Sequence, residues 1–207
     1  ELSTGDEKLD MDDEVRLWLQ NTVKQMHNVL NTSNFHTNIH ELYLDLGCFG
    51  TGLMRIEEDK EEVVKFQTRP IYEAYARENA QGNINTIYRS FKLDVNQIAE
   101  EFGTEMFDSQ LEGFLKNRDS QKLEILHVVE PVEQDDEFDQ RGFTYKSVYI
   151  LVDRKIPLKT GGFKEFPYVV PRWTKIAGEV YGRSPGMKAL PDIKMTNVVA
   201  KTTIRSA

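Results

Sequence analysis

The stretch between residues 172 and 194 constrains the fold more than any other part of the sequence. It follows an apolar run, Tyr168–Pro171, that is typical of a strand. Two glycines come next, and then the pair Ser184 and Pro185. Ser184 suits a helix N-cap, and Pro185 suits the first helical position because its missing N–H has no intrahelical partner there. The sequence therefore predicts a strand, a bend and a short helical turn, which Pro191 interrupts before a second helical stretch.

The glycines of this bend resemble a phosphate-binding loop only superficially. The run Gly178–Ser184 has three residues between its glycines, one fewer than that loop needs, and Arg183 stands where the loop has lysine. Glu179 would also repel a phosphate. We therefore expect an ordinary connection between a strand and a helix, with Trp173 and Tyr181 as buried anchors.

Helical spacing of apolar residues marks the N-terminal part of the chain. Over residues 12–31 the apolar side chains fall on one helical face, and the acidic residues 12–14 suit the start of a helix dipole. A second helix is predicted from about residue 34 to residue 46. Because only a short polar segment separates them, we expect these helices to form an antiparallel pair.

Alternating apolar residues and turn signals predict strands in the middle of the chain. These strands are 53–57, 63–68, 71–77 and 84–91. Turns rich in acidic residues, Asn and Gly separate them, as hairpins require. Residues 53–91 are therefore expected to form one small antiparallel sheet.

Short helices and further strands follow. Helices are predicted over 94–102, ended by Gly103, and around 111–115. The further predicted strands are 123–132, 143–152 and 166–173. An acidic solvated loop is expected at 133–137 and a turn at the glycine pair that begins at 161. The fold class is α+β, with an N-terminal helical pair, antiparallel sheet with short helices, and a C-terminal helix.

The order of these elements divides the 207 residues into three segments. Residues 1–47 form a helical segment, 48–183 an α+β domain, and 184–207 the start of a C-terminal helical segment. The chain has no apolar run long enough to span a membrane. It lacks an initiator Met and ends inside an amphipathic pattern, so we expect a piece of a longer protein.

Charge is distributed unevenly along the chain. The net charge of -8 and the pI near 5.1 argue against wholesale wrapping by nucleic acid. Basic residues nevertheless concentrate after position 154, whereas the acidic excess lies before it. This asymmetry suits a C-terminal part that faces a polyanion or an acidic neighbouring subunit, although chance segregation is the alternative.

The sequence offers little for catalysis or metal binding. His36 and His40 have the spacing of two ligands on one helical face, but no third ligand is evident nearby, so solvated helix residues are the alternative. His127 is isolated, as structural histidines often are. The single cysteine, Cys48, lies in an apolar context and is expected to be buried. We therefore predict no enzyme activity, no cofactor and no metal; the alternative is a metal-dependent nuclease or hydrolase that uses acidic residues.

The stretch 172–194 resembles a signature of head-to-tail connecting (portal) proteins of short-tailed bacteriophages. Its sequence runs RWTKIAGEVYGRSPGMKALPDIK. Two further pieces resemble the same family, namely FGTG at 49–52 and GNINTIYRSF at 82–91, followed by a short helix that ends in Phe102-Gly103. The acidic loop near 133–140 has no counterpart that we recognise.

The resemblance implies a structural protein. Family members form a ring of about twelve copies at one capsid vertex. DNA enters and leaves through the ring, the terminase docks there and supplies ATP hydrolysis, and the tail attaches there. The stretch 172–194 would lie where the outer wing passes into the stem helix that lines the channel. The resemblance implies location in the virion, with assembly in the host cytoplasm, and it makes four residues candidates for facing non-specific DNA or a neighbouring subunit. They are Arg183, Lys188, Lys194 and Lys201.

Overall fold

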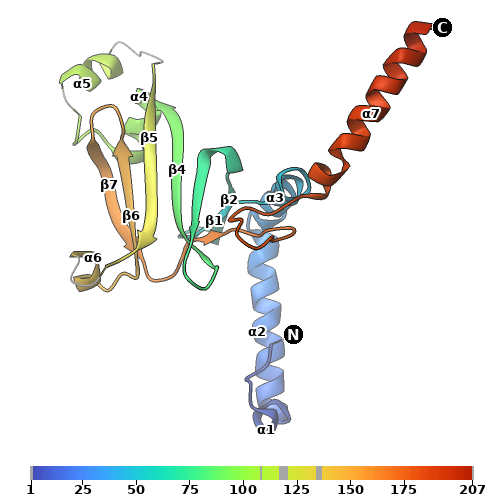
Figure 1. Ribbon diagram of the computed structural model, residues 1–207. Coiled ribbons are helices and arrows are strands. Elements are labelled where there is room, and N and C mark those ends of the chain that lie inside the picture. The colour runs from blue at the N-terminus through green and yellow to red at the C-terminus, as the bar shows by residue number, and fades with distance from the viewer. Residues whose placement is uncertain (1, 108, 117–120, 134–136, 207) are drawn as a thin grey trace.

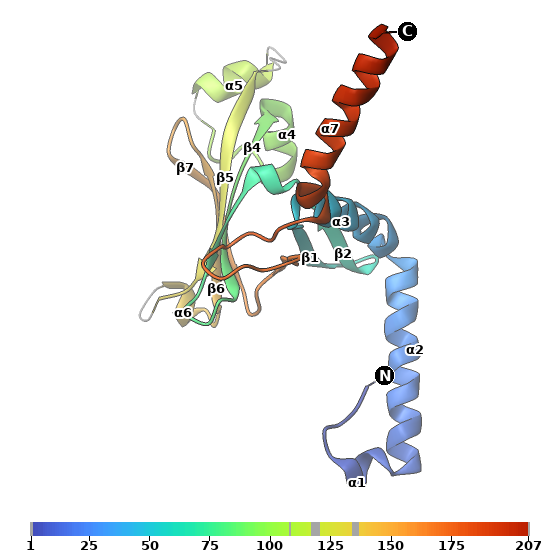
Figure 2. The ribbon, with the colours of Figure 1, turned by 45° about the vertical axis from the view of Figure 1, so that its right-hand side comes forward.

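The computed structural model describes residues 2–107, 109–116, 121–133 and 137–206. Two antiparallel sheets form its body, and two long helices project from that body in roughly opposite directions (Figures 1 and 2). The helices are α1 (Glu7–Asp10), α2 (Asp13–Thr32), α3 (Phe35–Phe49), α4 (Val95–Phe102), α5 (Ser109–Lys116), α6 (Glu137–Gln140) and α7 (Pro185–Ser206). The strands are β1 (Met54–Asp59), β2 (Val63–Thr68), β3 (Ala74–Glu78), β4 (Ile84–Asp94), β5 (Lys122–Pro131), β6 (Tyr145–Leu151), β7 (Ile156–Phe163) and β8 (Tyr168–Val169). The α+β class is confirmed.

The strands between residues 53 and 91 belong to two sheets, so the prediction of one sheet is wrong. The order β2-β1-β8 makes the smaller sheet, and β3-β4-β5-β6-β7 makes the larger one. A 3-10 turn, Ile71–Glu73, separates β2 from β3 and occupies the start of the strand predicted at 71–77. The pairing partners β5 and β8 lie far along the chain, so local alternation could not show this division.

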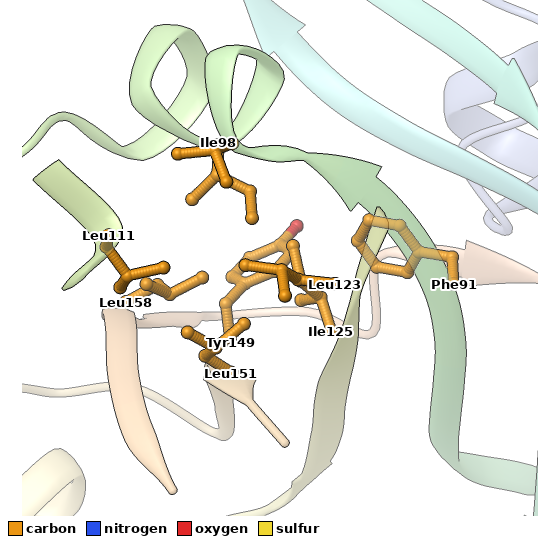
Figure 3. Packing of buried hydrophobic residues seen from close by; sticks show 9 residues of the cluster. Phe91, Ile98, Leu111, Leu123, Ile125, Tyr149, Leu151 and Leu158 are labelled. Carbon is orange, nitrogen blue, oxygen red and sulfur yellow. The ribbon is translucent and has the colours of Figure 1, made fainter. Parts of the chain in front are cut away.

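One face of the larger sheet carries the hydrophobic core. Residues that alternate along β4, β5 and β6 are buried, as expected for a sheet with one covered face. Helices α4 and α5 cover one end of this face, where Ile98 and Leu111 pack against Ile125 and Leu151 (Figure 3). The smaller sheet covers the other end through a second cluster. Its buried members are Leu53, Ala74, Ile87, Val129 and Tyr168.

The helices α2 and α3 do not form the expected antiparallel pair. They leave their connection in different directions and do not lie side by side (Figures 1 and 2). Asn34, between them, donates to the carbonyl of Phe66 at 2.8 Å and accepts from the Phe66 N–H at 2.9 Å. Thr68 makes similar bonds to Asn38. Helix α3 is therefore bound along strand β2, while a hydrogen bond between His36 and Asn31 joins it to α2 near their connection.

Several boundaries differ from the sequence prediction. The glycine pair at 161 lies inside β7 and makes no turn, and the last strand is much shorter than 166–173. Helix α7 continues through Pro191 as one element. Part of the acidic loop forms α6, and residues 134–136 lie outside the described part of the chain. Helix α4, with a capping box of Asp94 and Gln97, matches its prediction.

Cys48 is exposed, so the expectation of a buried cysteine is wrong. It lies in the last turn of α3, whose inward face is formed by Leu42 and Leu46 instead. Among the described residues, no helix combines the length and the hydropathy that a membrane crossing needs.

Candidate functional site

The segment between β8 and α7 forms a junction at which the smaller sheet, α3 and α7 meet. Residues 50–52 run beside both ends of this segment. Gly52 donates to the carbonyl of Pro171 at 3.1 Å, and the N–H of Trp173 donates to the carbonyl of Gly50 at 2.9 Å. On the other side, Gly182 donates to the Thr51 hydroxyl at 2.8 Å. The short piece 50–52 therefore holds the segment at its start and at its end.

Two glycines face each other in this junction. A side chain at Gly182 would overlap the carbonyl oxygen of Gly50, and a side chain at Gly50 would overlap the backbone from Gly182 to Ser184. Gly50 also has φ of 76°, a left-handed conformation that ends α3. The close approach of the two backbones therefore requires glycine at both positions.

Ser184 links the end of α3 to the start of α7. Its hydroxyl donates to the carbonyl of Cys48 at 2.7 Å and accepts from the N–H of Met187 at 2.9 Å. Ser184 is fully buried. The predicted N-cap is confirmed, and the same side chain satisfies one of the orphan carbonyls at the end of α3.

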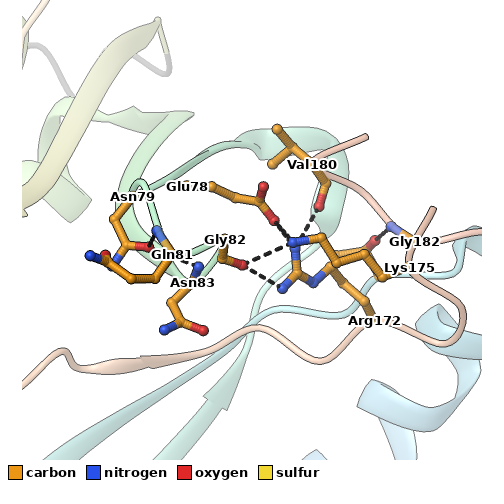
Figure 4. A network of polar contacts seen from close by, with 10 residues as sticks. Glu78, Asn79, Gln81, Gly82, Asn83, Arg172, Lys175, Val180 and Gly182 are labelled. Carbon is orange, nitrogen blue, oxygen red and sulfur yellow. Dashed lines mark hydrogen bonds and ion pairs between the residues drawn. The ribbon is translucent and has the colours of Figure 1, made fainter. Parts of the chain in front are cut away.

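An ion-pair network attaches the junction to the turn between β3 and β4. Arg172 and Lys175 both pair with Glu78, with Lys175 Nζ at 2.6 Å from the carboxylate. Both cations also donate to the carbonyl of Gly82, Arg172 at 3.2 Å and Lys175 at 3.0 Å. Figure 4 shows Arg172 reaching from the junction toward this turn. The two cations, Lys175 first, hold the pKa of the Glu78 carboxyl below its usual value.

The expected burial of two aromatic anchors is wrong. Trp173 is 59% exposed and Tyr181 is 38% exposed. The hydroxyl of Tyr181 instead bonds the edge strand β3, accepting from the N–H of Ala76 at 3.0 Å. The junction is held by backbone and polar contacts, so it needs no large side chain in its interior.

The four basic residues singled out by the resemblance do not share one face. Arg183, just before α7, is paired with Glu179 at 2.6 Å. Lys194 and Lys201 are seven residues apart in α7, which places them on one helical face at ~100° per residue. Lys188 precedes Lys194 by six residues and therefore lies ~120° around the helix. Arg205 extends the stripe of Lys194 and Lys201, and we call these three residues the basic stripe.

Helix α7 contacts the end of α3 with its first turn and is exposed over the rest of its length. The structure describes every residue of α7, and none of them is buried. Ile193 and Ile204 are 50% and 78% exposed. Together with Ala189 and Ala200 they form one apolar face about 100° away from the basic stripe, and further exposed apolar residues of α7 lie elsewhere around the helix. We call these four residues the apolar face of α7.

The histidines show no metal-binding arrangement. In the described ranges, no group of three His, Cys, Asp or Glu side chains lies close enough to hold a metal ion. His36 instead bonds the side chain of Asn31 at 2.9 Å. His127 is buried between Ser147 at 2.9 Å and Tyr168 at 3.1 Å, which confirms a structural histidine there.

Sequence reasoning missed the residues that build the junction. The sequence predicted no role for Thr51, Glu78 and Arg172, because the residues that they bond lie more than ninety positions away along the chain. The motifs FGTG and GEVYGRSP stand out in the sequence, yet nothing in either one indicates that their glycines touch. The contact between these glycines can be recognised only in the folded chain, where the two motifs lie together.

Comparison with known proteins places the whole chain in one family. Residues 1–207 match the family model described as bacteriophage head to tail connecting protein. The chain is 33% identical over 193 residues to the portal protein of Salmonella phage epsilon15, covering 90% of this chain and 35% of that protein. It is 31% identical over 198 residues to the probable portal protein of Bordetella phage BPP-1, covering 93% and 36%. The chain therefore spans about a third of the length of these relatives.

Proposed function

Because the chain belongs to the bacteriophage head to tail connecting protein family, we propose that it is part of a portal subunit. In this proposal the two sheets form a wing-like body and α7 begins the stem. Copies of the complete subunit form a ring of about twelve at a capsid vertex. Its further partners are the capsid, the terminase and the tail.

The exposure of α7 is the observation that carries this proposal. A helix with apolar residues and no buried position gains stability only when something packs against it. In a ring, the apolar face of α7 lies against the neighbouring copy. The same contact leaves the basic stripe free to line a channel for DNA of any sequence.

Assembly of the complete subunit tests the proposal. Ile193→Asp together with Ile204→Asp places charges on the apolar face and should prevent ring formation, because a buried unpaired carboxylate is strongly unfavourable. Mass photometry reports the number of copies per particle. Thr202→Asp is the matched control, because Thr202 lies on another face of α7 and should leave the ring intact. A complete ring in the double variant would contradict the proposed interface.

We also propose that the subunit is structural and not catalytic. Incubating it with duplex DNA and Mg²⁺ or Mn²⁺ should leave the DNA uncut. Metal-dependent cleavage that disappears when one carboxylate is replaced would favour the nuclease alternative and overturn this part of the proposal.

A further inference from the structure

The body of the chain is built in three layers. Strand β1 directs Leu53 and Arg55 toward the larger sheet, where Leu53 joins the second core cluster and Arg55 bonds Tyr149. The alternate residues Met54 and Ile56 pack on the other side of β1, against α3. The layers are therefore the larger sheet, the smaller sheet and α3, and Figure 2 shows the last two on the same side of the larger sheet. The two outer surfaces, on the larger sheet and on α3, point in opposite directions.

The outer face of the larger sheet is apolar across its middle. Six outward side chains lie there in two neighbouring rows of the register, and none of them belongs to a core cluster of the described residues. A solvated face of an antiparallel sheet normally carries polar residues, so an apolar one is typical of a sheet that something else covers. We call these six residues the sheet patch. They are Tyr75, Tyr88, Val128 and Val148 in one row, and Leu126 and Ile150 in the next.

Charged residues border the sheet patch. Lys92 stands opposite Glu124 at one end, and Lys146 stands opposite Glu130 at the other. Arg77, on the same face of β3, adds a third cation. An apolar centre with a polar rim is the arrangement that protein interfaces have. The rim of the sheet patch carries one positive charge more than it carries negative charges.

The outer side of α3 is also uncovered. Tyr43 and Leu44 are 62% and 58% exposed. Gly47 lies between them around the helix, at ~100° per residue, and a Cβ there would meet nothing within 4 Å. Helix α3 contains no Lys or Arg, and the carboxylates of Glu41 and Asp45 border this side. Burial, and then the charge of Glu41, raise the pKa of Asp45, so a cation placed beside this pair would be stabilising.

We propose that the sheet patch of one copy binds the outer side of α3 of the next copy. This inference rests on the proposed ring and assigns one of its contacts. The two surfaces differ and lie on opposite sides of the body, so each copy offers one surface to each neighbour, as a head-to-tail ring requires. Tyr43 and Leu44 cover the apolar centre, while Glu41 and Asp45 meet the rim with its excess of cations. Gly47 lets the backbone of α3 lie close to the sheet.

Cysteine cross-linking in the complete subunit tests this contact. Leu44→Cys and Val128→Cys are combined in a subunit whose Cys48 and any other cysteine are replaced by serine, and a short bismaleimide is added. The double variant should give a ladder of linked copies up to the size of the ring, because each copy is linked to both neighbours. Each single variant should stay unlinked. Leu17→Cys with Val128→Cys is the matched control and should give no ladder, because Leu17 is a leucine of α2 with similar exposure, 60%.

The results separate this contact from the ring itself. If mass photometry showed that the original complete subunit forms no ring, both the proposed function and this inference would be overturned. A ring that forms without a ladder in the double variant would overturn the contact alone. Linked pairs in the Leu44→Cys single variant would also overturn it, because α3 would then face α3 across a two-fold axis. Circular dichroism of the variants checks that both outward substitutions leave the fold unchanged.

Discussion

At the scale of single residues, two kinds of contact make the junction. The first is the approach of Gly50 and Gly182, in which two backbones meet without side chains between them. The second is the pairing of Glu78, at the end of β3, with the two junction cations Arg172 and Lys175. Neither contact depends on a large buried side chain, which explains why Trp173 can be exposed.

Gly182→Ala should lower the free energy of unfolding by at least ~2 kcal/mol, because the added methyl overlaps backbone atoms that cannot move independently. Chemical denaturation measures this decrease. Gly47→Ala is the control: its Cβ meets nothing, and alanine inside α3 should stabilise the chain by ~0.5–1 kcal/mol. Equal stability of the Gly182→Ala variant and the original chain would contradict the close contact between the backbones of Gly50 and Gly182.

Glu78 should make stability depend on pH in the acidic range. Its folded-state pKa lies below the usual 4.5, so its contribution is fully present above pH ~4.5 and is lost as pH falls through the folded pKa. Glu78→Gln should therefore be less stable than the original chain at pH 7, and the difference should shrink toward pH 3. Urea denaturation at both pH values measures it. If the difference in unfolding free energy between the two chains grew as the pH fell, the lowered pKa of Glu78 would be contradicted.

At the scale of elements, Ser184 makes α3 and α7 depend on each other. One hydroxyl serves the C-terminal end of α3 and the N-terminal end of α7. Helices joined in this way are both weakened at their ends when one small side chain is removed. The start of α7 is therefore fixed by a residue that belongs to no regular element.

Ser184→Ala should destabilise the chain by ~2 kcal/mol, because it removes an N-cap and leaves the carbonyl of Cys48 without its hydroxyl donor. Thermal or chemical unfolding measures this change. Thr196→Ala is the control, since the Thr196 hydroxyl bonds the carbonyl of Asp192 on the exposed surface of α7 and should change stability by less than ~0.5 kcal/mol. Similar destabilisation in both variants would contradict the conclusion that the Ser184 hydroxyl stabilises the ends of α3 and α7.

The sequence predicted most elements but not how they meet. Helices α2, α3 and α4 and strands β1, β2, β4, β5 and β6 were expected near their observed positions, because periodicity and capping are local signals. The division into two sheets was missed because it depends on β1 pairing with β8, which lies more than a hundred residues later. Strand β7 was missed because its glycines indicate a turn when they are considered alone.

The site was predictable only in part. The N-cap at Ser184 follows from a local Ser-Pro signal. The burial of Trp173 was wrong because an apolar side chain beside a strand indicates a core only if another element covers it.

At the scale of the whole molecule, the excess of basic residues lies in the part of the chain that ends in the projecting helix α7. Residues 154–207 hold 11 of the 26 Lys and Arg but only 3 of the 34 Asp and Glu. Helix α7, at the end of this basic part, projects away from the acidic remainder (Figure 1). An isolated copy should therefore bind duplex DNA weakly, since its net charge is negative.

In the assembled complete subunit, the basic stripe should contribute to sequence-independent DNA binding. Lys194→Gln with Lys201→Gln should reduce the slope of log affinity against log salt by about one for each phosphate that the ring no longer neutralises. Lys188→Gln, on another face of α7, should leave that slope unchanged. Fluorescence anisotropy with two unrelated duplexes measures it. Tight, sequence-selective and salt-insensitive binding would contradict the channel role of the stripe.

The length of α7 gives the junction a mechanical consequence. The helix has 22 residues, so it reaches about 33 Å from Ser184 to its end. As a lever fixed at one end, it converts a tilt of ~10° at the glycine contact into a displacement of ~6 Å at its tip. Small changes in the bonds around Gly50, Gly182 and Ser184 therefore become large movements far from the body, and the stiffness of these few bonds sets how accurately the tip is positioned.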